Sequence, residues 1–272
     1  MYIFLIQTLL ILSLSVYQVG AAYIYRRQSP DLGSQCRPFY TTFPPTSVSR
    51  NTYSAPFVAI SPAGSYQTTP GGLELYLNKP EGTIKTKQGA NDKTSEGATV
   101  NSTFAIHYGK VTFEVSAPAI PGVVTAAILI ADERDEIDVE LLGGDPAHWQ
   151  TNIFAPTRRD KEPLFGVFSS IERVPHPNPS IAKIHSYTID WNKERIEWGI
   201  DGRTVRTLKK EESMKGGVLH YPSHPSRLQL GIWDASSPSG TSEWAKGPIN
   251  WSDAPRSMKA VVRSVRVECP KY

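Results

Sequence analysis

Polar and hydrophobic residues alternate with a period of two along much of the chain. The alternation is clear over 104–115 and 228–233, and it recurs at 196–205 on both sides of an Asp-Gly pair, a strong β-hairpin signal. A continuous apolar run with β-branched residues at 122–131 is typical of a buried strand, and 258–268 is also strand-like. Many short strands separated by Gly/Pro turns predict an all-β protein, a sandwich or a jelly roll.

Other segments lack this alternation. Residues 23–60 are rich in Pro, Ser and Thr, so we expect an extended N-terminal arm there, and residues 84–103 are expected to form a polar surface loop. Only residues 207–215 (TLKKEESMK) have the character of a short helix. We find no repeat of fixed period. The arm is therefore expected to precede one domain over residues 61–272.

The N-terminus has the pattern of an export signal. Residues 2–16 form a mostly apolar run with an interior polar break at Gln7, and Val19-Gly20-Ala21 places small residues where a signal peptidase cleaves. The alternative is an uncleaved membrane anchor, although the run is short for a bilayer-spanning helix. We expect residues 1–22 to be a signal peptide, and the remaining protein to be secreted, extracellular or cell-wall-bound, and not held in a membrane.

Composition narrows the classes of partner. The hydrophobic fraction of 39% is enough for a packed core, and 22 prolines with 20 glycines disfavour long helices. The 29 basic and 26 acidic residues give a net charge of +3 with no basic run, so we expect no nucleic-acid partner. The six histidines form no ligand cluster, so we expect neither a metal nor a cofactor. A monomer is expected.

Export also changes the interpretation of cysteines and sequons. In an oxidising compartment the two cysteines, Cys36 and Cys269, favour a disulfide that closes almost the whole chain, with two separate thiols as the alternative. Asn101, in a polar stretch, is expected to be a glycosylation site. The second sequon, at Asn250, lies beside a Trp-rich segment and is the weaker candidate because it could be buried.

Three acids alternate with apolar residues in the segment 135–141 (DEIDVEL). On a strand Glu136, Asp138 and Glu140 share one face. This face must contact solvent or a ligand, because burying three adjacent carboxylates costs too much free energy. Retaining glycosidases need two carboxyl groups about 5–5.5 Å apart, whereas these two Glu α-carbons would be about 13 Å apart, so the side chains must lean together. Repulsion from the nearby Asp138 carboxylate would raise the pKa of at least one Glu, so that this Glu can stay protonated. A solvated acidic face or a calcium site are the alternatives.

Segment 136–140 (EIDVE) resembles the E-x-D-x-E signature of glycoside hydrolase family 16. Several further blocks, in the same order along the chain, resemble the fungal Crh-type cell-wall transglycosylases of that family. These blocks are 135–145, 150–152, 185–191, 196–207 and 221–251.

The resemblance implies a β-jelly-roll sandwich of two antiparallel sheets, concanavalin-like, with a concave sugar-binding cleft. It implies a double displacement on β-glucan or chitin of the cell wall, with Glu136 as nucleophile, Glu140 as acid/base and Asp138 as assisting residue. Water or a sugar hydroxyl would resolve the intermediate. Val139 stands where Crh-type enzymes favour an aromatic residue, and 234–237 where a Gly-containing loop is usual, which leaves the donor and acceptor sugars open.

Further residues are candidates for holding sugar, because pyranose rings present apolar faces that stack on aromatic side chains. Trp233 could instead be ordinary packing and Arg206 a surface ion pair, whereas Trp191 and Trp198 are expected in the core. A lectin-like binder on the same fold, without turnover, is the alternative function. The candidate substrate-binding residues are Gln150, Asn152, Phe154, Arg206, Gln229, Trp233, Glu243 and Trp244.

Overall fold

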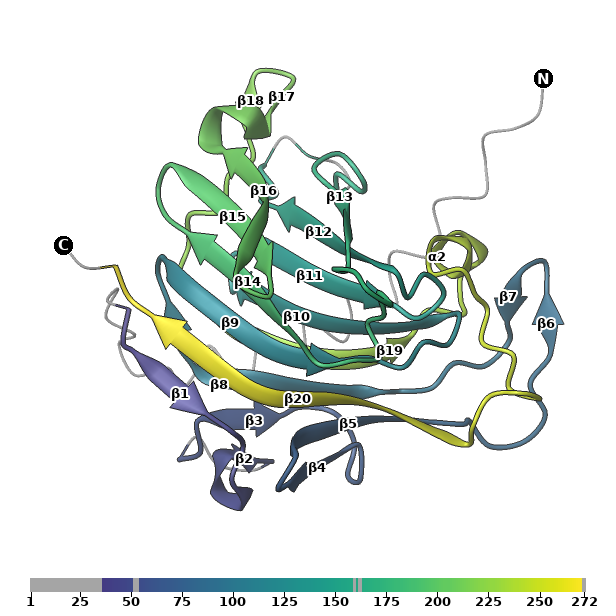
Figure 1. The fold of residues 1–272 in the computed structure, drawn as a ribbon. Helices are drawn as coiled ribbons and strands as arrows, with labels where there is room; N and C mark the ends of the chain where they lie inside the picture. The colour runs from purple at the N-terminus through teal and green to yellow at the C-terminus, as the bar shows by residue number, and fades with distance from the viewer. Residues whose placement is uncertain (1–35, 51–53, 159, 161–162, 271–272) are drawn as a thin grey trace, which may run out of the picture. The chain divides into compact units, whose positions relative to one another are not determined.

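The computed structural model describes residues 36–50, 54–158, 160 and 163–270, which form two stacked β-sheets (Figure 1). The expected signal peptide and the first part of the expected arm lie outside the described residues. Each sheet has eight strands, and all neighbouring strands are antiparallel except β2 and β3. The predicted all-β jelly roll is confirmed.

The first sheet is built around the long strand β20, whose two halves pair with different strands on the same side. One half of β20 pairs with β5, and the other half pairs with β1. The order of the first sheet is β16 (Arg203–Lys209), β15 (Arg195–Ile200), β14 (His185–Trp191), β9 (Gly109–Ser116), β20 (Ser257–Glu268), β5 (Gly72–Asn78) and β4 (Tyr66–Thr69), with β1 (Phe39–Thr41) beside β20.

The second sheet contains the strand with the three acids, β11, near its middle. Its order is β13 (Ser170–Arg173), β12 (His148–Phe154), β11 (Glu136–Leu142), β10 (Val123–Ala131), β19 (Ser226–Asp234), β8 (Ala98–Ile106), β3 (Phe57–Ala59) and β2 (Val48–Ser49). Small elements complete the fold: hairpins β6 (Thr86–Lys87)–β7 (Ala90–Asn91) and β17 (Met214–Lys215)–β18 (Val218–Leu219), and helices η1 (Pro45–Ser47), η2 (Lys210–Ser213) and α2 (Ser239–Trp244).

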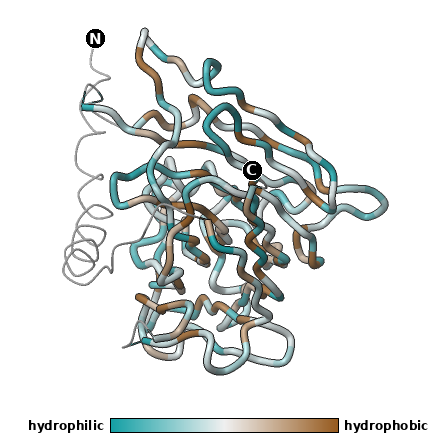
Figure 2. The backbone as a smooth tube through the Cα atoms, turned by 90° about the vertical axis from the view of Figure 1, so that its left-hand side faces the viewer, coloured by the Kyte–Doolittle hydropathy of each residue, from teal (hydrophilic) through white to brown (hydrophobic). Residues whose placement is uncertain are grey.

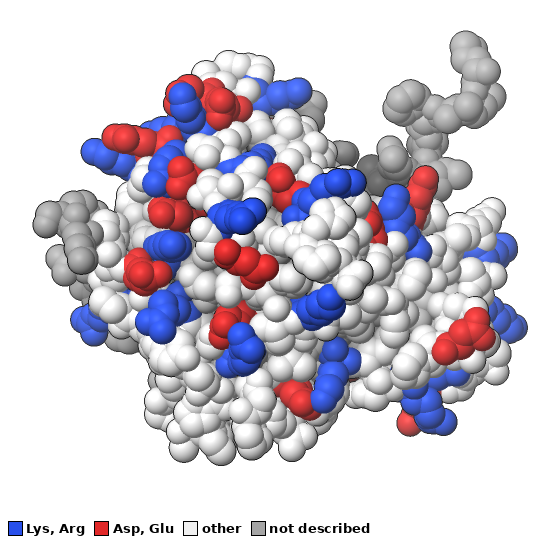
Figure 3. All heavy atoms as spheres, in the orientation of Figure 1, with Lys and Arg blue, Asp and Glu red and all other residues white. Residues whose placement is uncertain are grey.

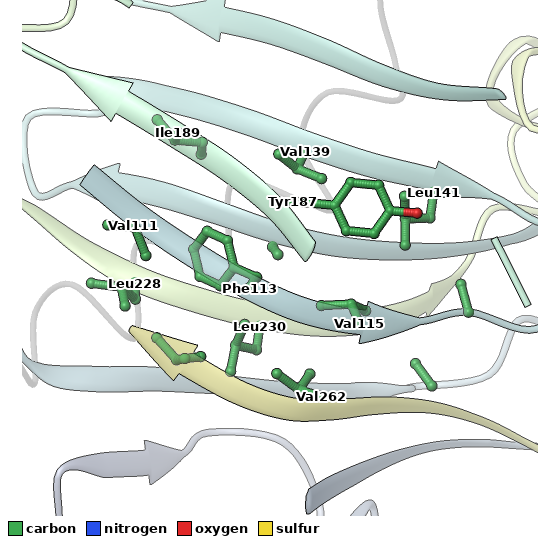
Figure 4. Close-up of a cluster of buried hydrophobic side chains, with 14 of the residues drawn as sticks. Val111, Phe113, Val115, Val139, Leu141, Tyr187, Ile189, Leu228, Leu230 and Val262 are labelled. Carbon is green, nitrogen blue, oxygen red and sulfur yellow. The ribbon is translucent and has the colours of Figure 1, made fainter. Parts of the chain in front are cut away.

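The hydrophobic core lies between the two sheets. Hydrophobic and hydrophilic positions both occur along the strands of the backbone (Figure 2). The buried hydrophobic side chains form one core cluster to which both sheets contribute. Phe113 and Val115 from β9 lie close to Leu230 from β19 and Leu141 from β11 (Figure 4), and all four are at most 1% exposed. Interdigitated side chains of this kind hold the two sheets together and set which face of each strand is left outside.

The Asp-Gly pair forms the expected hairpin. Asp201 and Gly202 connect β15 to β16 and have φ angles of 50° and 78°. A left-handed conformation at both positions is what the two-residue turn with the twist of the flanking strands requires. Ile200 pairs with Arg203 directly across the turn.

The helix expected at 207–215 is wrong. β16 continues to Lys209 because Leu208 pairs with Ile196 and its side chain is buried, with 8% of its surface exposed. Only one 3₁₀ turn, η2, follows. The polar loop expected at 84–103 is also corrected, since it contains the β6–β7 hairpin and the first half of β8. The α-helix in the described chain, α2, lies in a Gly- and Ser-containing segment where periodicity gave no signal.

The described part of the expected arm is packed into the domain. Strands β1, β2 and β3 join both sheets, and Phe43 and Phe57 are completely buried in the core. Their rings lie 5.2 Å apart. A boundary at residue 61 therefore does not divide the described structure.

Cys36 and Cys269 form a disulfide, as predicted. The two α-carbons are 5.5 Å apart and the sequence separation is 233 residues. The bond joins the segment before β1 to the end of β20, which are paired strands of the first sheet. It therefore closes a sheet edge at which both ends of the folded domain meet.

Opposite charges are interspersed on the surface. In the view of Figure 3, acidic and basic side chains alternate without a large patch of one sign. On the first sheet Glu74 and Lys259 form an ion pair at 2.6 Å, and Glu114 pairs with Arg263 at 2.7 Å. Within the described ranges, none of the helices has the length and apolar character needed to cross a bilayer.

We predict that the double variant Cys36→Ser/Cys269→Ser folds less stably. Removing the cross-link restores entropy to the unfolded chain, so the free energy of unfolding should fall by about 2–5 kcal/mol. Denaturant titration followed by fluorescence would measure the change. The wild type under reducing conditions is the matched control and should behave like the variant. An unchanged unfolding midpoint in both would contradict a stabilising role for the bond.

Candidate active site

The three acids of β11 lie on the face of the second sheet that is turned away from the first sheet, here called the outer face. The residues that alternate with them, Ile137 and Val139, are completely buried in the core. Because side chains of a strand point to opposite sides in turn, Glu136, Asp138 and Glu140 share the outer face. Asp138 is only 2% exposed, whereas the two Glu residues are half-buried.

Strand β12 places one polar or aromatic residue beside each acid. Three of the predicted substrate-binding residues pair directly with β11 in register. The pairs are Glu136 with Phe154, Asp138 with Asn152, and Glu140 with Gln150. Side chains opposite each other on antiparallel strands lie about 5 Å apart, so these residues border the acids.

On the other side of β11, the side chains of the outer face beside Glu140 are small. Glu140 pairs with Ala126 on β10, and Ala126 pairs with Gly231 on β19. These two small residues leave space above the sheet directly beside a half-buried carboxyl group. The sequence pattern did not predict a role for them. The available signal was a glycine inside an otherwise regular strand, which often marks close approach of a ligand.

Burial and mutual repulsion raise the pKa values of all three acids. Burial raises the pKa of Glu136, and a hydrogen bond from Asp138 partly offsets this. Burial, the charges of Glu136 and Glu140, and that same hydrogen bond hold the pKa of Asp138 well above its usual range. Burial and then the charge of Glu136 raise the pKa of Glu140 to about 8. The cluster therefore holds protons at neutral pH while Glu136 accepts a hydrogen bond, an arrangement that provides an acid and an anion side by side.

Two tryptophans and Gln150 meet at one end of the outer face. The rings of Trp233 on β19 and Trp244 on α2 stack with centroids 5.9 Å apart and planes at 19°. Trp244 Nε1 donates a hydrogen bond of 3.0 Å to Gln150 Oε1, which links α2 to the residue opposite Glu140. Both rings pack against a small apolar cluster that contains Val124 and Leu142. Glu243, another predicted binding residue, is exposed on the same helix.

The prediction that Arg206 binds sugar is wrong, and so is the alternative of a surface ion pair. Its guanidinium lies between the sheets, 4.5 Å from the ring centroid of Trp198. It donates to the backbone oxygens of Thr151, at 3.1 Å, and Phe168, at 2.6 Å, and to the Thr151 hydroxyl. Thr151 alternates with Gln150 and Asn152 on β12, so Arg206 lies on the side of that strand away from the acids.

Trp191 and Trp198 are in the core, as expected, with no exposed surface. Trp198 has a second task, because its Nε1 donates a hydrogen bond of 2.9 Å to the backbone oxygen of Asp138. The first sheet is thereby tied to the middle of the acidic segment. The partner of this indole could not be found from the sequence, since the two residues belong to strands of different sheets.

Asp135 anchors the loop before β19 to the beginning of β11. This carboxylate is 3% exposed and accepts hydrogen bonds from the backbone N–H groups of Ser223, at 2.6 Å, and His224, at 3.0 Å. His224 Nδ1 lies 2.8 Å from the same oxygen. Asp135 directly precedes Glu136, but no pattern in the sequence predicted its anchoring role.

The asparagine of the first sequon is buried, and the asparagine of the second sequon is exposed. Asn101 is 9% exposed within β8, which is paired on both sides, with β19 and β3. This burial makes Asn101 a poor carrier of a glycan, contrary to the prediction, because a polar stretch of sequence turned out to be an interior strand. Asn250, the weaker candidate because it could have been buried, is exposed, and its Nδ2 donates to Asp253.

The alternative of a calcium site finds no support. Among the described residues, no three His, Cys, Asp or Glu side chains are grouped as a metal site would require. Carboxylates arranged along a strand differ from the loop-wrapped ligands that calcium prefers. The acids are instead bordered by an amide, an aromatic ring and small residues.

The chain belongs to glycoside hydrolase family 16. The profile of "Glycosyl hydrolases family 16" matches residues 59–253, which include every strand of the outer face that borders the acids. The resemblance drawn from the sequence is thereby confirmed.

Within the family the chain is similar to Crh-type proteins. It is 36% identical over 242 residues to Crh-like protein 5 of Aspergillus fumigatus, covering 86% of this chain and 56% of that protein. It is 35% identical over 172 residues to Congo red hypersensitive protein 1 of Saccharomyces cerevisiae, covering 61% of this chain and 31% of that protein. The chain thus spans about half the length, or less, of these curated relatives.

Solved structures agree on the fold. The structure of Crh5 transglycosylase in complex with NAG matches with a TM-score of 0.66 and 30% identity, covering 90% of this chain and 92% of that one. A laminarinase catalytic domain from Thermotoga maritima matches with a TM-score of 0.67 over 88% of this chain and all of that one. At 16% identity the second likeness concerns the fold alone.

We predict that the acidic cluster makes the protein less stable at alkaline pH. Because burial raises their pKa values, these carboxyls bind protons more tightly in the folded than in the unfolded state, and this stabilisation is lost as the pH rises through the folded pKa of about 8 for Glu140. The free energy of unfolding of the wild type should decrease between about pH 5 and pH 9. Over the same range, the free energy of unfolding of Glu140→Gln should decrease by a smaller amount.

Urea titrations across this pH range would measure the effect. Glu81→Gln is the matched control, because Glu81 is exposed and far along the sequence from the cluster. It should keep the pH dependence of the wild type. If the free energy of unfolding changed with pH equally in Glu140→Gln and the wild type, the fold would not raise the pKa of the Glu140 carboxyl.

Proposed function

We propose that the protein is a retaining glycosidase or transglycosylase that acts on β-glucan or chitin. The observation that carries the proposal is the sharing of one face by Glu136 and Glu140, with Asp138 between them and hydrogen-bonded to Glu136, on a strand inside the segment that matches the family. A protein that only binds sugar has no need of two glutamates with raised pKa values. Retaining glycosidases require such a pair, one ionised and one protonated.

In the first step Glu140 acts as the acid and Glu136 as the nucleophile. Glu140 gives its proton to the glycosidic oxygen, the bond from that oxygen to the anomeric carbon breaks, and a Glu136 oxygen bonds to the same carbon. The raised pKa of about 8 keeps Glu140 protonated at neutral pH. Asp138 donates a hydrogen bond to Glu136, which positions that carboxylate and favours its ionised form.

In the second step the roles of Glu140 are reversed. The Glu140 carboxylate takes a proton from water or from a sugar hydroxyl, whose oxygen bonds to the anomeric carbon while the bond to Glu136 breaks. Water gives hydrolysis and a sugar hydroxyl gives transfer. The likeness to a protein named Crh5 transglycosylase supports transfer, and the NAG in its complex supports an amino-sugar polymer as one substrate.

The polysaccharide would lie across the strands of the second sheet. The stacked Trp233 and Trp244 offer a flat apolar surface for a pyranose ring, and Gln150, Asn152 and Gln229 offer amides to its hydroxyl groups. We propose a secreted or cell-wall protein as the natural context, because its substrate is outside the cell. The disulfide suits that compartment.

We predict that Glu136→Gln and Glu140→Gln abolish turnover but not binding. Losing the nucleophile stops the covalent step, and losing the acid/base should lower kcat by about 10²–10⁴-fold. Labelled chito- and β-glucan oligosaccharides, alone and mixed, should give new chain lengths with the wild type and none with Glu136→Gln. Glu81→Gln is the control for an isosteric change at an exposed glutamate.

The same experiment separates the alternatives. Shorter products alone indicate hydrolysis, and products longer than either starting chain indicate transfer. If the wild type binds the oligosaccharides and leaves their lengths unchanged, the protein is a lectin-like binder and the proposal fails.

We also predict that Ala126→Leu blocks the site. The larger side chain would fill the space beside Glu140, so kcat/KM should fall by roughly tenfold or more, while the outer-face position keeps the core packing intact. Ala126→Ser, which adds one oxygen, is the matched control and should stay close to wild type. Thermal unfolding of both variants would check the fold, and full activity of Ala126→Leu would place the substrate elsewhere.

A further inference from the structure

Asn101 belongs to the outer face of the second sheet, and this placement gives it a role other than carrying a glycan. The residue before it, Val100, is completely buried in the core and pairs with Leu230. Asn101 itself pairs with Gln229 on β19, the strand that also carries Trp233. By alternation Asn101 and Gln229 therefore present two neighbouring amides on the face that holds the acids.

A β-bulge directly after Asn101 fixes where it points. The register between β19 and β8 shifts there, since Arg227 pairs with Ala105 but Gln229 pairs with Asn101. Leu228 therefore faces three residues of β8, and its N–H donates to Ser102 Oγ at 2.9 Å. Bulges that re-aim a side chain are common beside functional sites.

The other residues of the sequon are engaged in building this bulge. Ser102 Oγ donates to the backbone oxygen of Phe104 at 2.5 Å. Thr103 Oγ1 lies 2.9 Å from the backbone oxygen of Ala55 and 3.1 Å from that of Pro56. The serine and threonine of the Asn-Ser-Thr motif thus have a structural use, and the motif is explained without glycosylation.

The carboxamide of Asn101 lacks a partner. Its Oδ1 atom is buried and accepts no hydrogen bond from any described residue. The same holds for Asp138 Oδ1 and Asn152 Oδ1, which lie on the same outer face. An unsatisfied buried polar group costs about 1–3 kcal/mol, so several of them on one face point to a polar ligand that completes them.

The position of Asn101 relative to the acids defines which part of a ligand it reaches. β8 is separated from β11 by β10 and β19, which places Asn101 about 14 Å from Asp138 at the usual strand spacing. Ile128 and Gln229 lie directly between the two, whereas the small residues Ala126 and Gly231 lie in the adjacent row, which leads from Glu140 to Thr99. A sugar chain that lies over these rows from Glu140 would bring a ring remote from the reacting bond to Gln229 and Asn101.

We propose that Asn101 is a substrate-positioning residue that binds a polar substituent of a sugar ring remote from the cleaved bond. The proposal rests on the proposed function, because it uses the same polysaccharide on the same face. Asn101 adds a contact that only oligosaccharides long enough to reach β8 can make. Its glycosylation would fill this part of the site, so Asn101 carries no glycan.

The first test is the dependence of Asn101→Ala on substrate length. For long chito- or β-glucan oligosaccharides KM should rise and kcat/KM fall by roughly three- to tenfold, the effect of one hydrogen bond. For the shortest substrates that are still turned over, kcat and KM should stay at wild-type values, which a general loss of structure would not allow. Asn250→Ala, which removes the exposed sequon, is the matched control.

A second variant and a second measurement keep the test decisive. Asn101→Leu is close in size, has no polar atom and also removes the sequon, so it replaces Asn101→Ala if that variant fails to fold, and it should show the same dependence on length. Glycopeptide mass spectrometry of the secreted wild type should find Asn101 unmodified. Equal effects on short and long substrates, no effect on long ones, or a glycan on Asn101 would each overturn the proposal.

The test also distinguishes failure of this proposal from failure of the proposed function. If the wild type leaves all oligosaccharides intact, the enzymatic function fails, and calorimetric binding of long and short oligosaccharides to Asn101→Ala becomes the readout. Weaker binding of long chains alone would then still support the positioning role. Unchanged binding of both would reject it.

Discussion

Packing of the two sheets is the constraint on which the rest of the structure depends. Ile137, Val139 and Leu141 bury almost all of their surface between the sheets, and each such side chain contributes roughly 1.5–3 kcal/mol to folding. A shift of β11 by one residue would expose them and bring the carboxylates into the core, at a prohibitive cost. The register that protects the core therefore also presents the acids on the outer face.

The electrostatic character of the site comes from the burial and mutual repulsion of the three acids. Neighbouring strands and the elements around the outer face remove water from the carboxyls, and this burial is the largest cause of the raised pKa of Glu140. The hydrogen bond from Trp198 to the backbone of Asp138 joins the core to the acidic segment. The position of the acids thus follows from the packing of the sheets, whereas their proton affinity follows from burial and charge on the outer face.

Supporting contacts around the sheet arise from residues distant in the sequence. Arg206 ties β16 to β12, and Asp135 holds the loop before β19 against the beginning of β11. The Cys36–Cys269 disulfide joins the two ends of the domain beside β1 and β20. Each of these groups holds backbone in place, so the acids and their neighbours on β12 are supported by a rigid frame.

Alternation alone predicted several of the strands, the shared face of Glu136 and Glu140, and the shared face of Gln150 and Asn152, because a period of two is a local property of the backbone. The hairpin at Asp201-Gly202 was equally readable, since its turn depends on two adjacent residues. Only the tertiary structure decided the burial of Asn101, the inward direction of Arg206 and the strand character of Leu208. Those outcomes depend on which strands become neighbours, and a pairing between residues far apart in the chain leaves no periodic trace in either of them.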